Sequence, residues 1–186
     1  MKTRNLILLM ALFAFGAKAQ EVKFPPLDGS PADIVYYPLN AAKVKAGENS
    51  SPVIKVVYSR PSKKGREIFG VLEPFGKIYR LGANENTEIR FFKPVVIGKK
   101  EIAAGTYSLF AIPNKESWTL ILNAQTDRWG AYSYNENKDV LRVEVPVKTL
   151  ENVIEAFSIT FVPQTDGAAL VIGWDKTSVQ LPVQFK

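Results

Sequence analysis

Short segments in which apolar and polar residues alternate recur along most of this chain, with turn-forming residues between them. Along residues 87–91, for example, Ile89 and Phe91 point to one side and the two charged residues to the other. An alternation with a period of two fits a β-strand that buries one face, whereas a helix repeats about every 3.6 residues. Helical spacing never extends beyond about two turns. The pattern therefore predicts an all-β fold with little helix.

The segments number about nine or ten, which suits two antiparallel sheets packed as one β-sandwich of the jelly-roll or Greek-key-like kind. One short helical turn is expected near residues 148–153. Pro182 cannot donate a backbone hydrogen bond, which indicates an edge position for the last strand. The expected strands are residues 34–37, 53–58, 87–91, 95–97, 105–110, 118–122, 140–145, 156–162, 170–174 and 179–185.

The first 19 residues have the three parts of a secretory signal peptide. Lys2 and Arg4 precede an apolar run at residues 6–15, and Ala17 and Ala19 are small residues at the positions that a signal peptidase reads. The apolar run is about half of the roughly 20 residues that a membrane-spanning helix needs. We therefore expect cleavage near Ala19 and a soluble chain in the periplasm or secreted, with no membrane span in its mature part.

The absence of two residue types excludes several kinds of chemistry. The chain has no cysteine and no histidine, so disulfides, thiolate sites, Ser-His-Asp triads and histidine-rich zinc sites cannot form. Removing residues 1–19 leaves 21 basic and 18 acidic residues, a net charge of +3, which is too small to indicate a nucleic-acid partner. We expect no metal and no cofactor.

The rest of the chain is expected to form an N-terminal arm and one domain. Residues 20–50 contain four prolines and two glycines, which indicates an arm that wraps the surface and contributes one strand. Residues 51–186 are long enough for a single core and too short for two comfortable domains. We expect that they form a single β-sandwich domain.

The connection between the strands expected at 53–58 and 87–91 does not follow this pattern. It is longer than 20 residues, and connections of that length in compact domains commonly serve a function. Its glycines allow a close approach of the backbone. The residues that make it a candidate ligand-binding site are Arg60, Lys64, Arg66, Tyr79, Arg80, Asn84 and Glu85.

The same region carries a resemblance to a known family. The motifs are Tyr58-Ser59-Arg60-Pro61-Ser62, Lys64-Gly65-Arg66, Ile68-Phe69-Gly70, Arg80 with Gly82-Ala83-Asn84-Glu85, Ala104 to Phe110, and Trp129-Gly130. In this order they resemble the secreted proteins of domain-of-unknown-function family 2911, over roughly residues 30–185. The family has no assigned function, so the resemblance implies no catalytic or binding residue. This chain has Tyr79 where the family favours tryptophan, and tyrosine keeps the aromatic face.

Two interpretations of the arginines stay open. Guanidinium groups bind carboxylates, phosphates and vicinal hydroxyls, so arginines close to Asn84 and Glu85 can line a pocket for an anionic or sugar-like ligand. Alternatively, they pair with Glu85 and pin the long connection to a sheet. Among the aromatic residues, Trp118 is expected in the core, and the loop that holds Trp129, Tyr132 and Tyr134 is the better candidate for stacking on a ligand.

The favoured interpretation is a binding or structural module that takes a small molecule, a glycan or an envelope protein. One alternative is a glycan hydrolase, which needs two carboxyl groups roughly 5–10 Å apart. Another is a module that binds a protein through an edge strand. Residues 135–139 are a polar turn, because they lack the glycine of a calcium loop. The carboxylates available for a hydrolase are Glu67, Glu73, Glu85, Glu88 and Asp127.

Overall fold

The structure is a computed structural model that describes residues 21–43, 45 and 51–186. The predicted signal peptide lies outside this part of the chain. The described part contains nine strands and two short 3-10 helices, η1 (Ala41–Lys43) and η2 (Glu136–Lys138). The strands are β1 (Ala32–Tyr37), β2 (Ile54–Ser59), β3 (Thr87–Phe91), β4 (Val95–Ile97), β5 (Lys100–Ile102), β6 (Gly105–Pro113), β7 (Ser117–Asn123), β8 (Asp139–Gln164) and β9 (Gly167–Phe185).

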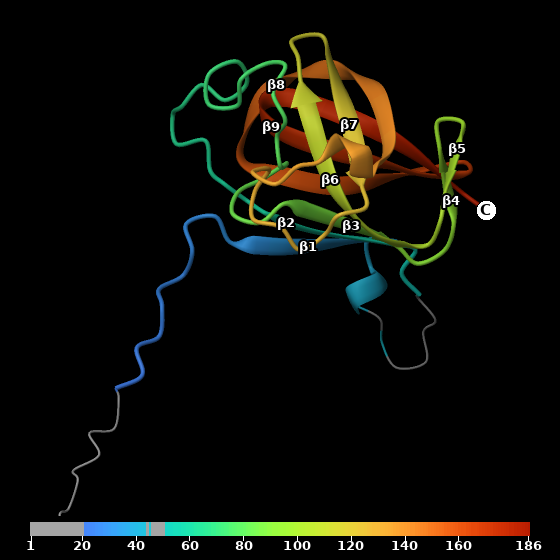
Figure 1. Cartoon of the computed structure of the whole chain (residues 1–186), viewed down its shortest axis with the longest axis horizontal. Helices are drawn as coiled ribbons and strands as arrows, with labels where there is room; N and C mark the ends of the chain where they lie inside the picture. Colours follow the sequence, from blue (N-terminus) through green and yellow to red (C-terminus); the bar gives the residue numbers. More distant parts are fainter. Residues whose placement is uncertain (1–20, 44, 46–50) are drawn as a thin grey trace, which may run out of the picture.

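All nine strands belong to a single antiparallel sheet, in the order β1-β2-β3-β6-β7-β8-β9-β4-β5 (Figure 1). The predicted all-β, antiparallel fold with little helix is confirmed. The sequence led us to expect two separate sheets, whereas here one sheet folds over itself and forms both layers. The strands predicted at 87–91 and 95–97 have the observed bounds.

The last strand, β9, doubles back on itself. A straight strand of 19 residues would separate its ends by about 60 Å. Instead, the amide of Phe185 donates to the carbonyl of Asp166 (2.9 Å), so both ends of β9 lie side by side. Asp175, near the middle of the strand, has a φ of +54°. The two segments predicted at 170–174 and 179–185 are thus the two arms of β9.

Strand β8 follows β9 around this bend on the outside (Figure 1). Thr149 pairs with Thr177 and Ile154 with Asp175, so five steps along β8 match two steps along β9. The outer strand of a bent ribbon has the longer path and therefore needs extra residues. These extra residues are the segment for which a helical turn was predicted at 148–153. That prediction is wrong, because the segment is extended and belongs to β8.

A short stretch of backbone pairing joins β8 to the chain that leaves β2. The amide of Lys63 donates to the carbonyl of Glu155 (2.7 Å), and the amide of Phe157 donates to that of Pro61 (2.9 Å). The ammonium group of Lys63 also lies 3.2 Å from the carboxylate of Asp175 at the bend of β9. We call this pairing of residues 61–63 with 155–157 the closure. It connects strands that are distant in the sheet order, so the two layers enclose one core.

Aromatic side chains cross that core from one layer to the other. The rings of Tyr58 in β2 and Phe157 in β8 lie 5.9 Å apart, and those of Tyr37 in β1 and Phe161 in β8 lie 5.8 Å apart. Trp118 is 1% exposed, which confirms its predicted place in the core. Burial of large aromatic surface is the main stabilising contribution in such a core.

The ends of the chain differ in part from the expectation. Residues 21–27 extend away from the strands rather than along the surface (Figure 1), and only the part from Ala32 onward joins the sheet. Pro182 lies in β9 between β8 and β4, so its strand is not at an edge. The pairs between β9 and β8 extend as far as Val179 of β9, and the pairs between β9 and β4 begin at Gln184. Pro182 lies between these two stretches of pairing. In the described residues, no helix has the length and apolar character required to cross a membrane.

The contact between the two arms of β9 yields a stability prediction. A Cβ atom on Gly167 would lie 2.0 Å from the carbonyl oxygen of Val183, and backbone cannot move aside cheaply. We expect Gly167→Ala to lower the free energy of unfolding by about 3 kcal/mol or more. Gly29→Ala is the control, since a Cβ there meets nothing within 4 Å. Urea unfolding measures both, and equal stability of the two variants would contradict the doubled-back strand.

Candidate functional site

The connection between β2 and β3, residues 60–86, is fixed to the domain at both ends. At its start it forms the closure with β8. At its end it pairs with a second loop: the amide of Asn86 donates to the carbonyl of Arg128 (3.0 Å), and the amide of Gly130 donates to that of Asn84 (2.9 Å). The two long irregular segments of the domain, residues 60–86 and 124–138, therefore form one continuous surface.

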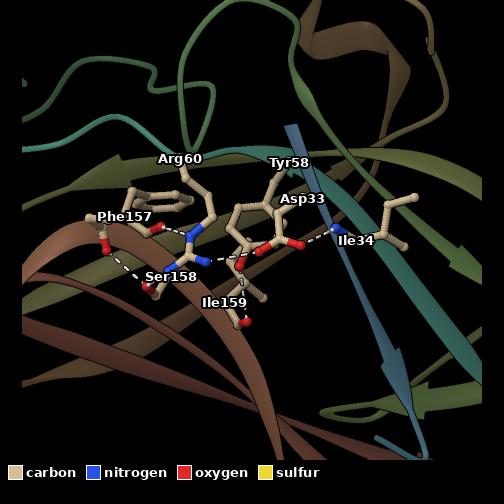
Figure 2. Close-up of polar contacts among 8 residues, drawn as sticks. Asp33, Ile34, Tyr58, Arg60, Phe157, Ser158 and Ile159 are labelled. Carbon is tan, nitrogen blue, oxygen red and sulfur yellow. Dashed lines mark hydrogen bonds and ion pairs between the residues drawn. The ribbon is translucent and has the colours of Figure 1, made fainter. Parts of the chain in front are cut away.

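Arg60 is a structural residue in this arrangement. Figure 2 shows its guanidinium group between β1 and β8, where Nε donates to the carbonyl of Phe157 (3.2 Å) and Nη2 to the hydroxyl of Ser158 (2.9 Å). Nη1 forms an ion pair with Asp33 at 2.9 Å. All three nitrogens are engaged by the protein. Arg60 thus pins the start of the connection through Asp33 and β8, and not through Glu85 as the alternative interpretation had it.

Lys64 and Arg66 line neither of the two cavities described below, although the charge of Arg66 is near enough to act on Glu73. Both are exposed. The backbone amide of Lys64 donates to the carboxylate of Glu155 (2.8 Å), and Arg66 donates to the carbonyls of Ser62 (2.6 Å) and Lys63 (2.9 Å). These contacts shape the turn that follows the closure. The structure does not bring Arg60, Lys64 and Arg66 together with Arg80 into one site.

Asn84, Glu85 and Trp129 meet where the two loops pair. Glu85 and Trp129 form an isolated antiparallel bridge. The side-chain amide of Asn84 donates to Asp28 of the arm (3.1 Å). Glu85 is exposed and makes no ion pair within the described part of the chain, so it is not buried against arginines. Trp129 is 60% exposed and lies outside both cavities described below.

Glu85 borders a cavity of about 290 Å³ that also contains Glu88 and Asp127. We call it the acidic cavity. A carboxylate oxygen of Glu88 accepts the amide of Asp127 (2.7 Å), and the Asp127 carboxylate accepts the hydroxyl of Thr126 (2.8 Å). Two of the three carboxylates are thus used to hold the loop in place.

A second cavity, of about 300 Å³, is also lined by residues from both loops. Its walls include Glu73, Tyr79 and Arg80 from the connection and Tyr132 from the second loop. We call it the Glu73–Arg80 cavity. The Arg80 side chain has one hydrogen bond within the described residues, from Nε to the carbonyl of Gly82 (3.3 Å). The Glu73 carboxyl has none there, and the two side chains form no direct ion pair.

The protonation of Glu73 reflects its surroundings. Burial raises the pKa of this carboxyl to about 7, and the positive charges of Arg80 and Arg66 counteract that rise only in part. At neutral pH the group is therefore about half protonated and can either donate or accept a hydrogen bond.

Tyr79 forms the inner wall of the Glu73–Arg80 cavity. It is 2% exposed, and no group satisfies its hydroxyl with hydrogen-bond geometry, although the backbone of Gly82 is near enough to lower its pKa slightly. Burial, and then the negative charge of Glu73, raise the pKa of Tyr79 well above its ordinary value. The Tyr79 ring packs against Phe69 and Phe157 in the core, so its hydroxyl is enclosed and is not offered to the cavity. The polar groups that the cavity presents are the Glu73 carboxyl and the Arg80 guanidinium.

Glu73 was among five acidic residues named from the sequence and was not singled out. It is the single charged residue in the run Val71-Leu72-Glu73-Pro74-Phe75, and a lone acid between apolar residues is the signal that could have identified it.

Tyr134, a candidate for stacking, is held by packing instead: its ring lies 5.2 Å from Phe110 and its hydroxyl donates to Asp139 (2.6 Å).

The contacts of Arg60 predict that the protein loses stability when the guanidinium group of this residue is removed. Arg60→Lys keeps the charge near Asp33 but cannot reach Phe157 and Ser158 together. We expect the free energy of unfolding to fall by about 1–3 kcal/mol, mostly from the lost hydrogen bonds, because an exposed ion pair adds little. The matched control is Arg66→Lys, with an expected change below about 0.5 kcal/mol. Urea unfolding compares them, and similar losses would argue against the role of Arg60.

The raised pKa of Glu73 predicts how stability depends on pH. Because the folded-state pKa is about 7 and the ordinary value is 4.5, folding favours the protonated carboxyl. The stabilisation that the protonated Glu73 gives to the folded state is fully present below about pH 4.5 and disappears as the pH rises through 7. The free energy of unfolding then falls by at most about 3 kcal/mol. Glu73→Gln should abolish this fall in the free energy of unfolding, so that at pH 8 the variant is more stable than the wild-type protein.

The control for this prediction is Glu67→Gln, an exposed acid in the same segment. Thermal unfolding between pH 4.5 and 8 measures all three proteins. If the wild-type protein and Glu73→Gln lose stability in parallel, groups other than Glu73 are responsible.

The comparisons with known proteins concern the family rather than the chemistry. Neither the curated proteins nor the solved structures gave a match. The family model described as "Protein of unknown function (DUF2911)" matches residues 40–183. This range includes every strand from β2 to β8 and all the residues that line the two cavities except Ala32. The chain therefore belongs to the DUF2911 family.

Proposed function

We propose that this protein is an exported binding module that takes a small anionic or sugar-like ligand in the Glu73–Arg80 cavity. The observation that carries the proposal is the pair of unsatisfied charged groups in one half-buried cavity: the Arg80 guanidinium, with both Nη atoms free of hydrogen bonds to the described residues, and the Glu73 carboxyl. By contrast, Arg60, which holds the scaffold, has a protein partner at each of its three guanidinium nitrogens.

The two groups favour a ligand with two kinds of polar atom. The free edge of a guanidinium binds a carboxylate or phosphate through two parallel hydrogen bonds, and these are stronger where water is partly excluded. A carboxyl with a pKa near 7 accepts from or donates to a hydroxyl. A ligand that carries an anionic group and a hydroxyl satisfies both.

The two alternatives find weaker support. A glycan hydrolase needs a pair of carboxyl groups on either side of the scissile bond, and Glu73 is the only carboxylate among the residues that line its cavity. The acidic cavity has three, but two of them already bind the loop. For binding through an edge strand, β1 and β5 are the ends of the sheet; β5 has only three residues, whereas β1, with six, is of ordinary length.

Titration calorimetry at pH 6 with carboxylates, inorganic phosphate and neutral sugars tests the proposal. We expect at least one anionic compound to bind. Arg80→Gln should weaken that binding at least tenfold while leaving urea stability within about 0.5 kcal/mol, because the side chain has little to lose within the protein. Arg90→Gln, an exposed residue of β3 outside this cavity, is the control. Unchanged binding by Arg80→Gln would refute the proposal.

A further inference from the structure

The rim of the Glu73–Arg80 cavity carries an aromatic side chain with no partner. Tyr132 is 85% exposed, and within the described residues it forms neither a ring contact nor a hydrogen bond. A single exposed aromatic residue is ordinary on a protein surface, but this one lines the same cavity as Arg80 and Glu73, where a bound ligand can reach its ring.

Gly130 brings this ring and the Arg80 guanidinium to the same place. A Cβ on Gly130 would lie 2.9 Å from Nη1 of Arg80 and 3.1 Å from Cε2 of Tyr132. Nη1 of Arg80 and Cε2 of Tyr132 are therefore no more than about 6 Å apart. Within the described residues the two side chains form no cation–π contact with each other. Both groups stay available to one ligand.

The dimensions of the cavity limit the size of that ligand. Its volume of about 300 Å³ is at the lower end of the range for small-molecule sites, about 300–1,000 Å³. One six-membered ring with its substituents fits such a space, whereas a longer chain would have to continue into solvent. The tyrosine face suits the C–H face of a saturated ring, while Arg80 and Glu73 suit a carboxylate and a hydroxyl.

We infer that the ligand is a sugar acid in its pyranose form, with its ring against Tyr132, its carboxylate on Arg80 and a hydroxyl group at Glu73. This inference rests on the proposed function and specifies the ligand class. Tyr132 would determine specificity for the ring, and Arg80 would determine specificity for the charge.

The test compares three compounds that differ in one property at a time. D-Glucuronate has the ring and the carboxylate, D-glucose has the ring alone, and D-gluconate has the carboxylate on an open chain. By calorimetry at pH 6, we expect glucuronate to bind at least tenfold more tightly than either of the others. Tyr132→Ala should weaken glucuronate about five- to tenfold and leave gluconate unchanged. The control, Trp129→Ala, removes an exposed aromatic of the same loop that does not line the cavity.

The outcomes separate this inference from the proposed function. If gluconate binds as well as glucuronate and Tyr132→Ala has no effect, the inference is overturned and the anion-binding site stands. If glucose binds as tightly as glucuronate, the carboxylate requirement is overturned. If no acid or sugar binds to the wild-type protein, both are overturned. Circular dichroism of each variant checks that folding is unchanged, which the exposure of Tyr132 leads us to expect.

Discussion

The closure between residues 61–63 and 155–157 is the contact on which the rest of this fold depends. Two backbone hydrogen bonds, of 2.7 and 2.9 Å, join the chain leaving β2 to the second half of β8. They close the edge between the two layers, which the aromatic side chains of the core also hold together. Arg60 reinforces the closure from outside by bridging Asp33 and Ser158 (Figure 2). The long connection to β3 thus starts from a fixed point.

The function proposed for this connection follows from how its charged residues are used. Arg60 is satisfied by three partners on β1 and β8, whereas Arg80 has one partner, two residues away in its own segment. The Glu73 carboxyl lies in the same cavity as Arg80 but forms no ion pair with it. A protein that leaves a carboxyl and a guanidinium unpaired in a half-buried space loses stability there, and such a loss is typical of binding sites.

The sequence predicted the local structure better than the long-range contacts. Alternation identified residues 87–91 and 95–97 as strands because each strand exposes one face and buries the other. It failed at residues 148–153, where the outer strand of a bent ribbon needs extra residues and loses its regular period. The candidate site was predicted in part. Tyr79 and Arg80 line a cavity, as predicted. The partners of Arg60 were not predictable, because they lie 27, 97 and 98 residues away in the sequence. The raised pKa of Glu73 depends on burial that only the fold creates.

A crystal structure of the protein grown with D-glucuronate tests the central claim most directly. The account predicts the sugar acid in the Glu73–Arg80 cavity, with its carboxylate within hydrogen-bond distance of both Nη atoms of Arg80 and with Arg60 still bound to Asp33 and Ser158. An empty cavity in which Arg80 forms an ion pair with Glu73 would contradict it, because the two charged groups would then satisfy each other as part of the scaffold.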